Sequence, residues 1–219
     1  MRIHLFQGAA FRPLLSENMG SEEREALSIG FLSLLPDPDG TGRCNIYVDP
    51  CALEGKKYGH EGMVKAAWYI LHDALETEST QQKGVVFLVY LRGALLRHFD
   101  RKLIQHLTTS IRGILPVRVS GIHMFHAPYL FEVMFDVIAL MLGERLTKRM
   151  KMYSDEEDDV IHEKLNDFGI IPSRLPTALG GSIEFCDGKW KQQETICVSE
   201  DEKDSLQEVG SIESKEYVR

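Results

Sequence analysis

The chain has 219 residues, of which 43% are hydrophobic, and its formal net charge is −8. This length and hydrophobic content predict one globular domain with a sizeable core. The acidic balance argues against a general nucleic-acid-binding protein, because such proteins carry a basic footprint that displaces counterions from phosphates.

The first half of the chain alternates helical and strand patterns. Acids in the first turn and apolar residues at helical spacing predict a helix over 21–35, and the turn-forming stretch PDPDGTG stops it. A short strand over 43–49 and an amphipathic helix over 59–76 follow. The run 83–91 is β-branched and aromatic without alternation, which is typical of a strand covered on both faces. These elements predict a sheet with helices on both sides.

The same pattern continues in the second half of the chain. A helix is predicted over 100–115, with apolar residues on one stripe, and a second buried strand over 119–125. The order strand, helix, strand implies a right-handed crossover and a largely parallel pairing. The stretch 127–142 predicts a helix opened by a proline near its first turn.

The C-terminal third predicts shorter elements. We expect a short strand within 147–154, a helix over 155–169 with acids toward its positive N-terminal end, and a turn over 175–185 that feeds a last edge strand. From about Lys189 the chain is polar, rich in Glu, Ser and Lys, and has little to bury. This composition predicts a disordered tail.

The compartment is predicted from the N-terminus and from the cysteines. Residues 1–15 contain no continuous apolar run that precedes a small-residue cleavage site, which argues against a secretory signal. The four cysteines have no C-x-x-C spacing and are expected to be free thiols. Pro128, Glu132 and Asp136 interrupt the most apolar stretch, so no run suffices to span a bilayer. We therefore expect a cytosolic protein.

The turn PDPDGTG invites two catalytic or metal-binding interpretations. An Asp-x-Asp-Gly-Thr turn can supply the nucleophile and acid of a haloacid-dehalogenase-type phosphatase, with Asp37 and Asp39 in those roles. That chemistry also needs a downstream acidic Gly-Asp motif, and the chain has no Gly-Asp dipeptide. A calcium loop starting at Asp37 would place Val48 where a bidentate Glu is needed. Neither interpretation is favoured.

Two histidines near the second buried strand are the other candidate metal ligands. His123 and His126 are three residues apart, so on a strand their side chains point to opposite faces and cannot hold one ion. The chain also lacks a nucleophile elbow, a P-loop and a dinucleotide fingerprint. We therefore predict no catalytic residues, no metal and no cofactor.

The helix expected over 129–142 is unusually apolar. Glu132 and Asp136 lie four residues apart on one narrow stripe, and apolar side chains cover most of the remaining circumference. A helix packed between core elements would explain this composition. However, a basic run over 145–151 follows directly, and an apolar element beside basic residues is expected of a surface that docks on anionic lipid.

A resemblance to a known family rests on the order of several motifs. VRVSGIHMFHAP is followed by an aromatic-rich helix, then by RLTKRMKMYS and then by IIPSRLPTALGG. In this order and spacing the chain resembles the CRAL-TRIO lipid-binding domain of phosphatidylinositol-transfer, tocopherol-transfer and retinal-binding proteins, over about residues 42–185. Its most specific part is the ending with Leu175, Pro176, Gly180 and Gly181, because proline fixes an extended approach and glycines permit a turn closed to other residues.

The resemblance implies an α/β fold in which a mixed, largely parallel β-sheet forms the floor of an apolar cavity. Helices flank this sheet, and the helix after Pro128 is a mobile lid over a single lipid. Helix and strand faces, together with position in the family pattern, select the expected lipid-binding wall: Leu107, Ile111, Leu115, Ile122, Met124, Phe131, Met134 and Ile138.

Departures from the family pattern narrow the expected ligand. Members that hold phosphatidylinositol resemble one another in a Glu before the pocket strand and a Lys inside the LP-x-x-x-GG motif. Val117 and Ala178 stand at these positions here, which argues against an inositol headgroup inside the cavity. The tocopherol-transfer type instead uses a basic surface cluster to hold a membrane phosphoinositide. The corresponding membrane and phosphoinositide patch, with Ser120 in place of one basic residue, is Arg118, Arg145, Lys148 and Arg149.

These observations predict a non-enzymatic carrier that binds one small hydrophobic lipid and transfers it between membranes. Its expected partners are that lipid and an anionic membrane surface, and nucleic acid is not expected as a partner. Its expected location is the cytoplasm, with peripheral membrane association. We expect a short helical region over 1–36, the CRAL-TRIO-like domain over 37–188 and an acidic tail over 189–219. An alternative function is that of an interaction or regulatory module that kept the fold but lost the cavity.

Overall fold

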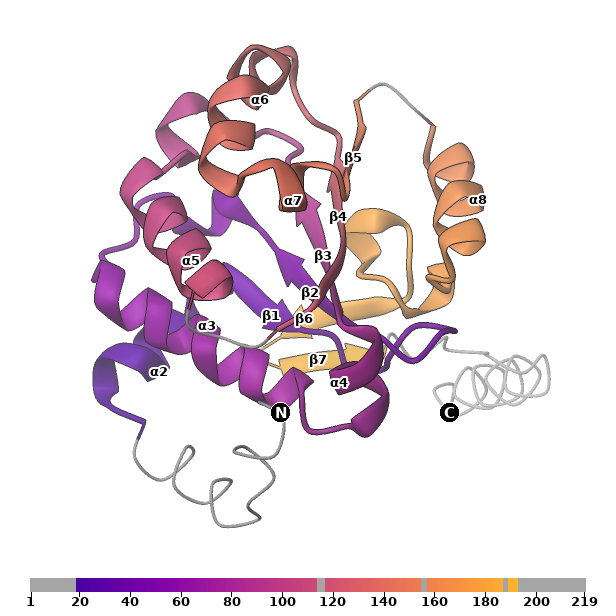
Figure 1. Cartoon of the computed structure of the whole chain (residues 1–219), viewed down its shortest axis with the longest axis horizontal. Helices are drawn as coiled ribbons and strands as arrows, with labels where there is room; N and C mark the ends of the chain where they lie inside the picture. The colour runs from indigo at the N-terminus through magenta and orange to yellow at the C-terminus, as the bar shows by residue number, and fades with distance from the viewer. Residues whose placement is uncertain (1–18, 114–116, 155–156, 187–188, 193–219) are drawn as a thin grey trace, which may run out of the picture.

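A five-stranded sheet organises the computed structural model, which describes residues 19–113, 117–154, 157–186 and 189–192 (Figure 1). The strands have the spatial order β1-β2-β3-β4-β5. The pairs β2–β3, β3–β4 and β4–β5 are parallel, and β1 is antiparallel to β2, which confirms the predicted mixed, largely parallel sheet. The bounds are β1 Leu32–Leu34, β2 Cys44–Val48, β3 Val85–Tyr90, β4 Val119–Phe125 and β5 Met150–Tyr153.

Helices cover both faces of this sheet. Figure 1 shows α3, α5 and α6 on one side and α8 on the other. The α-helices are α2 Ser21–Ser28, α3 His60–Ala74, α4 Glu78–Lys83, α5 Arg101–Gly113, α6 Tyr129–Leu142, α7 Glu144–Thr147 and α8 Asp158–Phe168. The 3-10 helices are η2 Pro50–Leu53, η3 Leu96–His98, η4 Pro172–Arg174 and η5 Thr177–Leu179. The arrangement is an α/β layered fold.

The central strands are buried on both faces, as the run 83–91 predicted. Side chains of a strand alternate between the two faces of the sheet. In β4, Ile122 and Met124 belong to the core under α3, α5 and α6, whereas Phe125 packs with α8 in a second core. In β3, Val86 and Leu88 face the second core and are fully buried. Apolar residues are therefore required at successive positions.

The predicted helix over 21–35 is too long. Helix α2 ends at Ser28, and Gly30 then adopts a positive φ of 81°. Phe31, Ser33 and Leu35 are buried and alternate with half-buried neighbours, which is the period of a strand. The segment forms β1 and pairs with β2 at the edge of the sheet. A positive-φ glycine breaks the helix, because L side chains rarely adopt that conformation.

The turn PDPDGTG joins β1 to β2 and is held by one buried carboxylate. Asp39 is 4% exposed. Its Oδ1 accepts hydrogen bonds from the Thr41 N–H at 2.9 Å, the Thr41 hydroxyl at 2.8 Å and the Arg43 N–H at 2.9 Å. Its Oδ2 accepts from Arg43 Nε at 2.6 Å. Because both oxygens are engaged in the turn, Asp39 has a structural role and the phosphatase interpretation has no support.

The C-terminal strands do not extend the main sheet. We expected a last edge strand within 175–185, but β6 Ile183–Cys186 pairs antiparallel with β7 Lys189–Gln192 in a separate two-stranded sheet. Strand β7 occupies the first four residues of the predicted tail, and residues 193–219 lie outside the described residues. Helix α4, which Thr77 caps through the Thr80 N–H, was not predicted either.

The LP-x-x-x-GG motif closes the second core with a tight backbone crossing. The Leu175 carbonyl accepts a hydrogen bond from the Ile183 N–H at 3.1 Å, and the Pro176 carbonyl accepts one from the Gly181 N–H at 3.0 Å. Gly180 has a φ of 72°. A Cβ at Gly181 would overlap the backbone carbonyl of Leu175. Glycine is therefore required at position 180 because φ is positive, and at position 181 because the backbone of Leu175 leaves no room for a Cβ.

His123 is the most buried histidine of the second core. Its Nδ1 lies 2.9 Å from the Tyr153 hydroxyl, and its ring meets the Phe168 ring edge-on at 4.6 Å between centroids. Burial, followed by the positive charges of Lys151 and Arg43, lowers its pKa to about 4. An unfolded histidine has a pKa of about 6.5, so the unfolded chain binds more protons between these values. Stability is complete above about 6.5 and is lost as pH falls toward 4.

Acid should therefore destabilise the fold through His123. Between pH 7.0 and pH 4.5 we expect this residue alone to lower the free energy of unfolding by about 2 to 3 kcal/mol. In His123→Asn the loss over the same interval should be smaller by that amount, because asparagine does not titrate. Urea unfolding at the two pH values measures both losses. Equal losses in the two proteins would contradict the assignment.

Candidate functional site

An apolar cavity lies between the main sheet and the helices α3, α5 and α6. Its volume is about 200 Å³. Alternate positions of neighbouring strands form its floor, among them Ile46 of β2, Val89 of β3 and Ile122 of β4. Helix α6 closes one side with Phe131 and Ile138. The site is thus a partly open hydrophobic space rather than a cluster of reactive groups.

Most of the residues predicted for the cavity wall lie around this space. Met134 is half-buried and packs against the adjoining core. The side chain of Ile111 and the whole of Leu115 lie outside the described residues. The predicted residues that line the cavity are Leu107, Ile122, Met124, Phe131 and Ile138. That they contact a lipid stays a prediction.

Sequence reasoning missed other wall residues because they come from elements far apart in the chain. Phe31 precedes β1, which was predicted as helix, and Leu146 belongs to the short α7. Phe99 lies in the connection between η3 and α5. Ile70 and Leu103, by contrast, lie on predicted apolar helix faces, so the helical periodicity could have identified them.

Asp100 lies at the polar edge of the cavity and caps α5. Its Oδ1 accepts from the Leu103 N–H at 3.0 Å, and its Oδ2 accepts from the Tyr58 hydroxyl at 2.9 Å. His60 Nε2 lies 2.8 Å from the same Oδ2. Burial raises the pKa of Asp100, but the hydrogen bonds from Leu103, His60 and Tyr58 outweigh burial and hold the pKa below its ordinary range. The carboxylate is therefore engaged by the protein itself.

Cys51 and His98 form a second polar group beside the cavity. Cys51 Sγ lies 3.5 Å from His98 Nδ1, which also accepts the Leu95 N–H at 3.1 Å, and His98 Nε2 lies 3.3 Å from Glu54 Oε2. The order thiol, imidazole, carboxylate resembles a catalytic arrangement. However, burial and then the charges of Asp49 and Glu54 raise the thiol pKa of Cys51. A reactive cysteine has a lowered pKa, so the raised pKa gives no support to a nucleophilic role for Cys51.

Helix α6 is apolar on both its inner and its outer face. Phe131 and Ile138 point inward and are 5% and 6% exposed, whereas Tyr129 and Leu140 are 79% and 83% exposed. The segment at η3, which shares the cavity wall with α6, also exposes apolar side chains. Together the exposed large apolar residues of these two elements are Leu95, Leu96, Tyr129, Val137 and Leu140. Such exposure on a folded domain is typical of an interaction surface.

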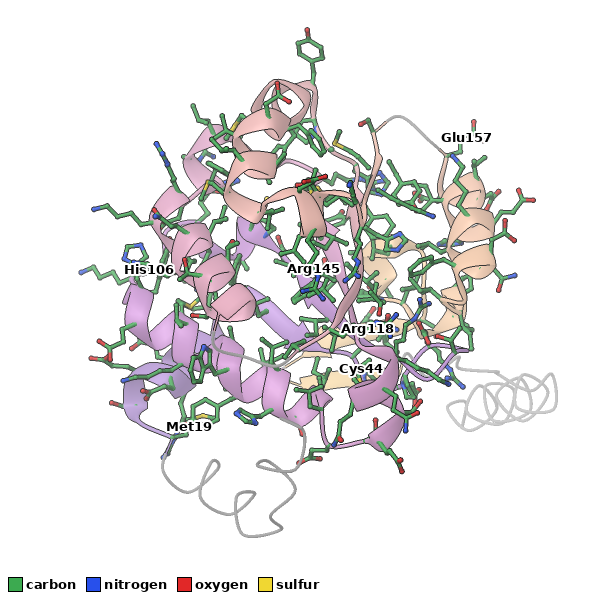
Figure 2. The ribbon with its side chains drawn as sticks, viewed as in Figure 1. Met19, Cys44, His106, Arg118, Arg145 and Glu157 are labelled. Atoms are coloured by element: carbon green, nitrogen blue, oxygen red, sulfur yellow. The ribbon has the colours of Figure 1, made fainter. Side chains whose placement is uncertain are left out.

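The predicted basic patch spans the start of β4, α7 and the residues before β5. Arg149 donates to the carbonyl of Val119 in β4, whereas Arg118 donates to the Gln82 carbonyl in α4 at 3.3 Å. Lys148 pairs with Glu144 at 2.6 Å. Figure 2 shows Arg118 at the start of β4 and Arg145 on α7. Arg145 is exposed.

Neither a metal centre nor a spanning helix occurs in the described part of the chain. Within the ranges given above, no helix is long and apolar enough to cross a bilayer. No group of three or more His, Cys, Asp or Glu side chains in those same ranges could hold a metal ion. His123 lies in the second core and His126 at the end of β4, so the structure does not bring them together as ligands.

Three comparisons relate the chain to known proteins. The model of the CRAL/TRIO domain matches residues 30–181. The chain is 24% identical over 197 residues to alpha-tocopherol transfer protein-like of Homo sapiens, covering 87% of this chain and 55% of that protein. It is 25% identical over 171 residues to tyrosine-protein phosphatase non-receptor type 9 of Mus musculus, covering 78% of this chain and 27% of that protein.

A solved structure shares the fold. The crystal structure of Sfh5 superposes with a TM-score of 0.51 at 13% sequence identity, covering 74% of this chain and 64% of that chain. At this identity the likeness concerns the fold alone. The chain spans about half the length of the alpha-tocopherol transfer protein-like relatives that it matches.

Proposed function

The chain belongs to the CRAL/TRIO domain family, and on that premise we propose that it carries one small hydrophobic lipid between membranes without changing it chemically. The family typically binds small lipophilic ligands. The observation that carries the proposal is the apolar cavity of about 200 Å³ closed by a helix that is apolar on both faces. The protein would act in the cytoplasm and need no cofactor.

A closed apolar cavity meets the main physical difficulty of lipid exchange. Exposing a sixteen-carbon chain to water costs on the order of 13 kcal/mol at about 0.8 kcal/mol per methylene, so spontaneous desorption is very slow. A cavity wall built from Ile122, Met124 and Phe131 replaces that water. The lipid then crosses the aqueous phase inside the protein rather than in solution.

Loading the cavity requires α6 to move. Small-molecule sites usually enclose roughly 300 to 1,000 Å³, which is more than the about 200 Å³ enclosed here. Helix α6 is bounded by Pro128, its N-cap, and by Gly143, whose φ is 75°. Because glycine tolerates large backbone changes, we propose that α6 is a lid that swings about these two ends.

A membrane would provide the surface for this movement. The exposed side chains Tyr129, Val137 and Leu140 can enter the boundary between headgroups and acyl chains. The patch of Arg118, Arg145, Lys148 and Arg149 supplies positive charge for anionic lipids, including phosphoinositides, in an otherwise acidic chain.

Removing one free charge of the patch should weaken docking measurably. Arg145→Ala is expected to lower the affinity for anionic vesicles about fivefold, at about 1 kcal/mol per basic residue near the surface. Binding to neutral vesicles should not change. Lys57→Ala, which removes an exposed basic residue outside the patch, is the matched control. Vesicle flotation at low and high salt measures the vesicle affinity of both variants. An equal loss of affinity in the two variants would contradict a role of the patch in docking.

The experiment that tests the proposed function is extraction and delivery of lipid. The full chain is incubated with donor vesicles that contain labelled neutral lipids, separated from them, and presented to acceptor vesicles. We expect protein-bound label at about one molecule per chain and its appearance in the acceptor. A protein that extracts no lipid of any class would refute the carrier function.

A second candidate is an interaction module that uses the same fold. The modest cavity volume favours it, and so does a relative named as a tyrosine-protein phosphatase, of which this chain covers 27%. In that case the exposed face of α6 would contact a protein and the cavity would stay empty. Lipid extraction separates the two candidates.

A further inference from the structure

The residue that leads from β4 into α6 has an unusual backbone conformation. His126 has a φ of 51°, and it stands two residues before Pro128, the N-cap of α6. A non-glycine residue with positive φ is uncommon, although histidine is among the residues enriched there. Such strain persists only where the surroundings hold it, and it concentrates at switch regions. His126 therefore lies just before the N-terminal end about which we propose that α6 turns.

Side chains from two other elements hold His126 in this conformation. Arg92 Nη2 lies 3.3 Å from His126 Nδ1 and 3.2 Å from Nε2. Asp158 Oδ1, in the first turn of α8, lies 3.5 Å from Nε2 and 3.8 Å from Arg92 Nη2. The Tyr90 ring meets the imidazole edge-on at 5.9 Å between centroids. The root of α6 is thus fastened to β3 and to α8.

The arrangement favours a neutral imidazole. The Arg92 guanidinium is permanently charged and can only donate. Protonation would place a second positive charge within 3.3 Å of it. The side chain is 12% exposed. Burial and then Arg92 lower the pKa of His126, and Asp158 opposes them in part. Among the described residues, Arg92, Asp158 and the Tyr90 phenol are the charged or titratable groups that face the ring.

We propose that His126 is an acid-sensitive latch at the root of α6, which holds the lid closed when neutral and releases it when protonated. This inference rests on the proposed function only in taking α6 as the lid. By linkage, the closed form, in which the pKa is lowered, is favoured above the ordinary value of about 6.5. The open form, in which His126 is solvated, gains as pH falls below that value.

An anionic membrane supplies the acid locally. The surface potential of a cytoplasmic leaflet is about −30 mV, which concentrates protons and lowers the surface pH by about half a unit. The basic patch would bring the protein to such a surface. Arrival at the membrane then shifts the latch only part of the way toward release, because half a unit below neutral brings the surface pH to about 6.5, where the open form begins to gain.

Hydrogen–deuterium exchange of the full, lipid-free chain tests the latch without any ligand. From pH 7.5 to pH 5.5 we expect exchange of the α6 amides, Tyr129–Leu142, to rise by about threefold or more after correction for the intrinsic rate, because the open form binds the proton more readily than the closed form. Peptides of α3, His60–Ala74, serve as the internal reference and should not change in the same way.

Two variants test whether His126 causes this pH-dependent rise in α6 exchange, which is called the pH step below. His126→Asn keeps a residue that tolerates positive φ and can accept from Arg92, but it does not titrate, so its α6 exchange should be equal at both pH values. Arg92→Gln should exchange faster than the wild type already at pH 7.5. The latch is overturned by a wild type without a pH step in α6, by a step that persists in His126→Asn, or by an equal step in α3. Lipid extraction is scored separately, so the latch and the carrier function can fail independently.

Discussion

Val89→Trp is expected to weaken lipid binding roughly 100-fold and leave the protein folded. Val89 lies on the central strand β3 and points into the cavity, where it is only half-buried because the space before it is empty. An indole there occupies room for about four methylenes of a ligand. At about 0.8 kcal/mol each, this loss is about 3 kcal/mol, or roughly 100-fold in affinity. Titration with a fluorescent neutral lipid measures it.

The matched control adds the same side chain outside the cavity. Val160→Trp changes an exposed valine of α8, on the opposite side of the sheet, and should bind lipid like the wild type. The thermal midpoint of ligand-free Val89→Trp should lie close to that of the wild type, because the indole fills empty space instead of displacing packed atoms. Undiminished lipid affinity in Val89→Trp would exclude this cavity as the binding site.

Gly181→Ala is expected to have the largest effect on stability. The new Cβ would overlap the backbone carbonyl of Leu175, and a backbone carbonyl cannot rotate away as a flexible side chain can. The same carbonyl accepts the Ile183 N–H, so its displacement also disturbs the entry into β6. We expect a loss of about 3 kcal/mol or more in the free energy of unfolding, which lowers the thermal midpoint by about 6 to 12 °C.

Gly59→Ala is the control for the glycine-to-alanine exchange itself. Gly59 precedes α3 with a φ of −89°, and a Cβ there would have no neighbour within 4 Å. Its substitution should change the midpoint by no more than about 2 °C. A Gly181→Ala protein that melts with the wild type would show that the backbone crossing of the LP-x-x-x-GG motif is not as tight as the structure has it.

Parts of the fold with a strong local pattern could be predicted from the sequence. The run Val85–Tyr90 is apolar at successive positions because both faces are covered, and it forms β3. The run Val119–Phe125 is mostly buried although Ser120 and His123 interrupt its apolar residues, and it forms the parallel strand β4. Strand β1 could not be recognised in the same way. It is three residues long, and the helix before it ends at Ser28, ahead of Gly30, whose positive φ is visible only in the structure.

The candidate site was predictable where it follows a helix face or a strand face. Leu107 and Ile138 were identified by helix face, and Ile122 and Met124 by strand face, in each case together with their position in the family pattern. Phe31 and Leu146 could not be identified, since they reach the cavity from a misassigned strand and from a short helix. The strained His126 and its contacts with Arg92 and Asp158 depend on tertiary geometry that no local pattern encodes.

The proposed carrier function depends on one hydrophobic ligand bound in the cavity. Native mass spectrometry of the full chain, purified from its own host, tests this binding most directly. We expect a population heavier than the polypeptide by the mass of one neutral apolar compound, and lipid analysis of the same sample should identify that compound. Val89→Trp, prepared in parallel, should carry none. A wild-type protein that is empty after gentle purification, and stays empty after incubation with vesicles, would contradict the carrier.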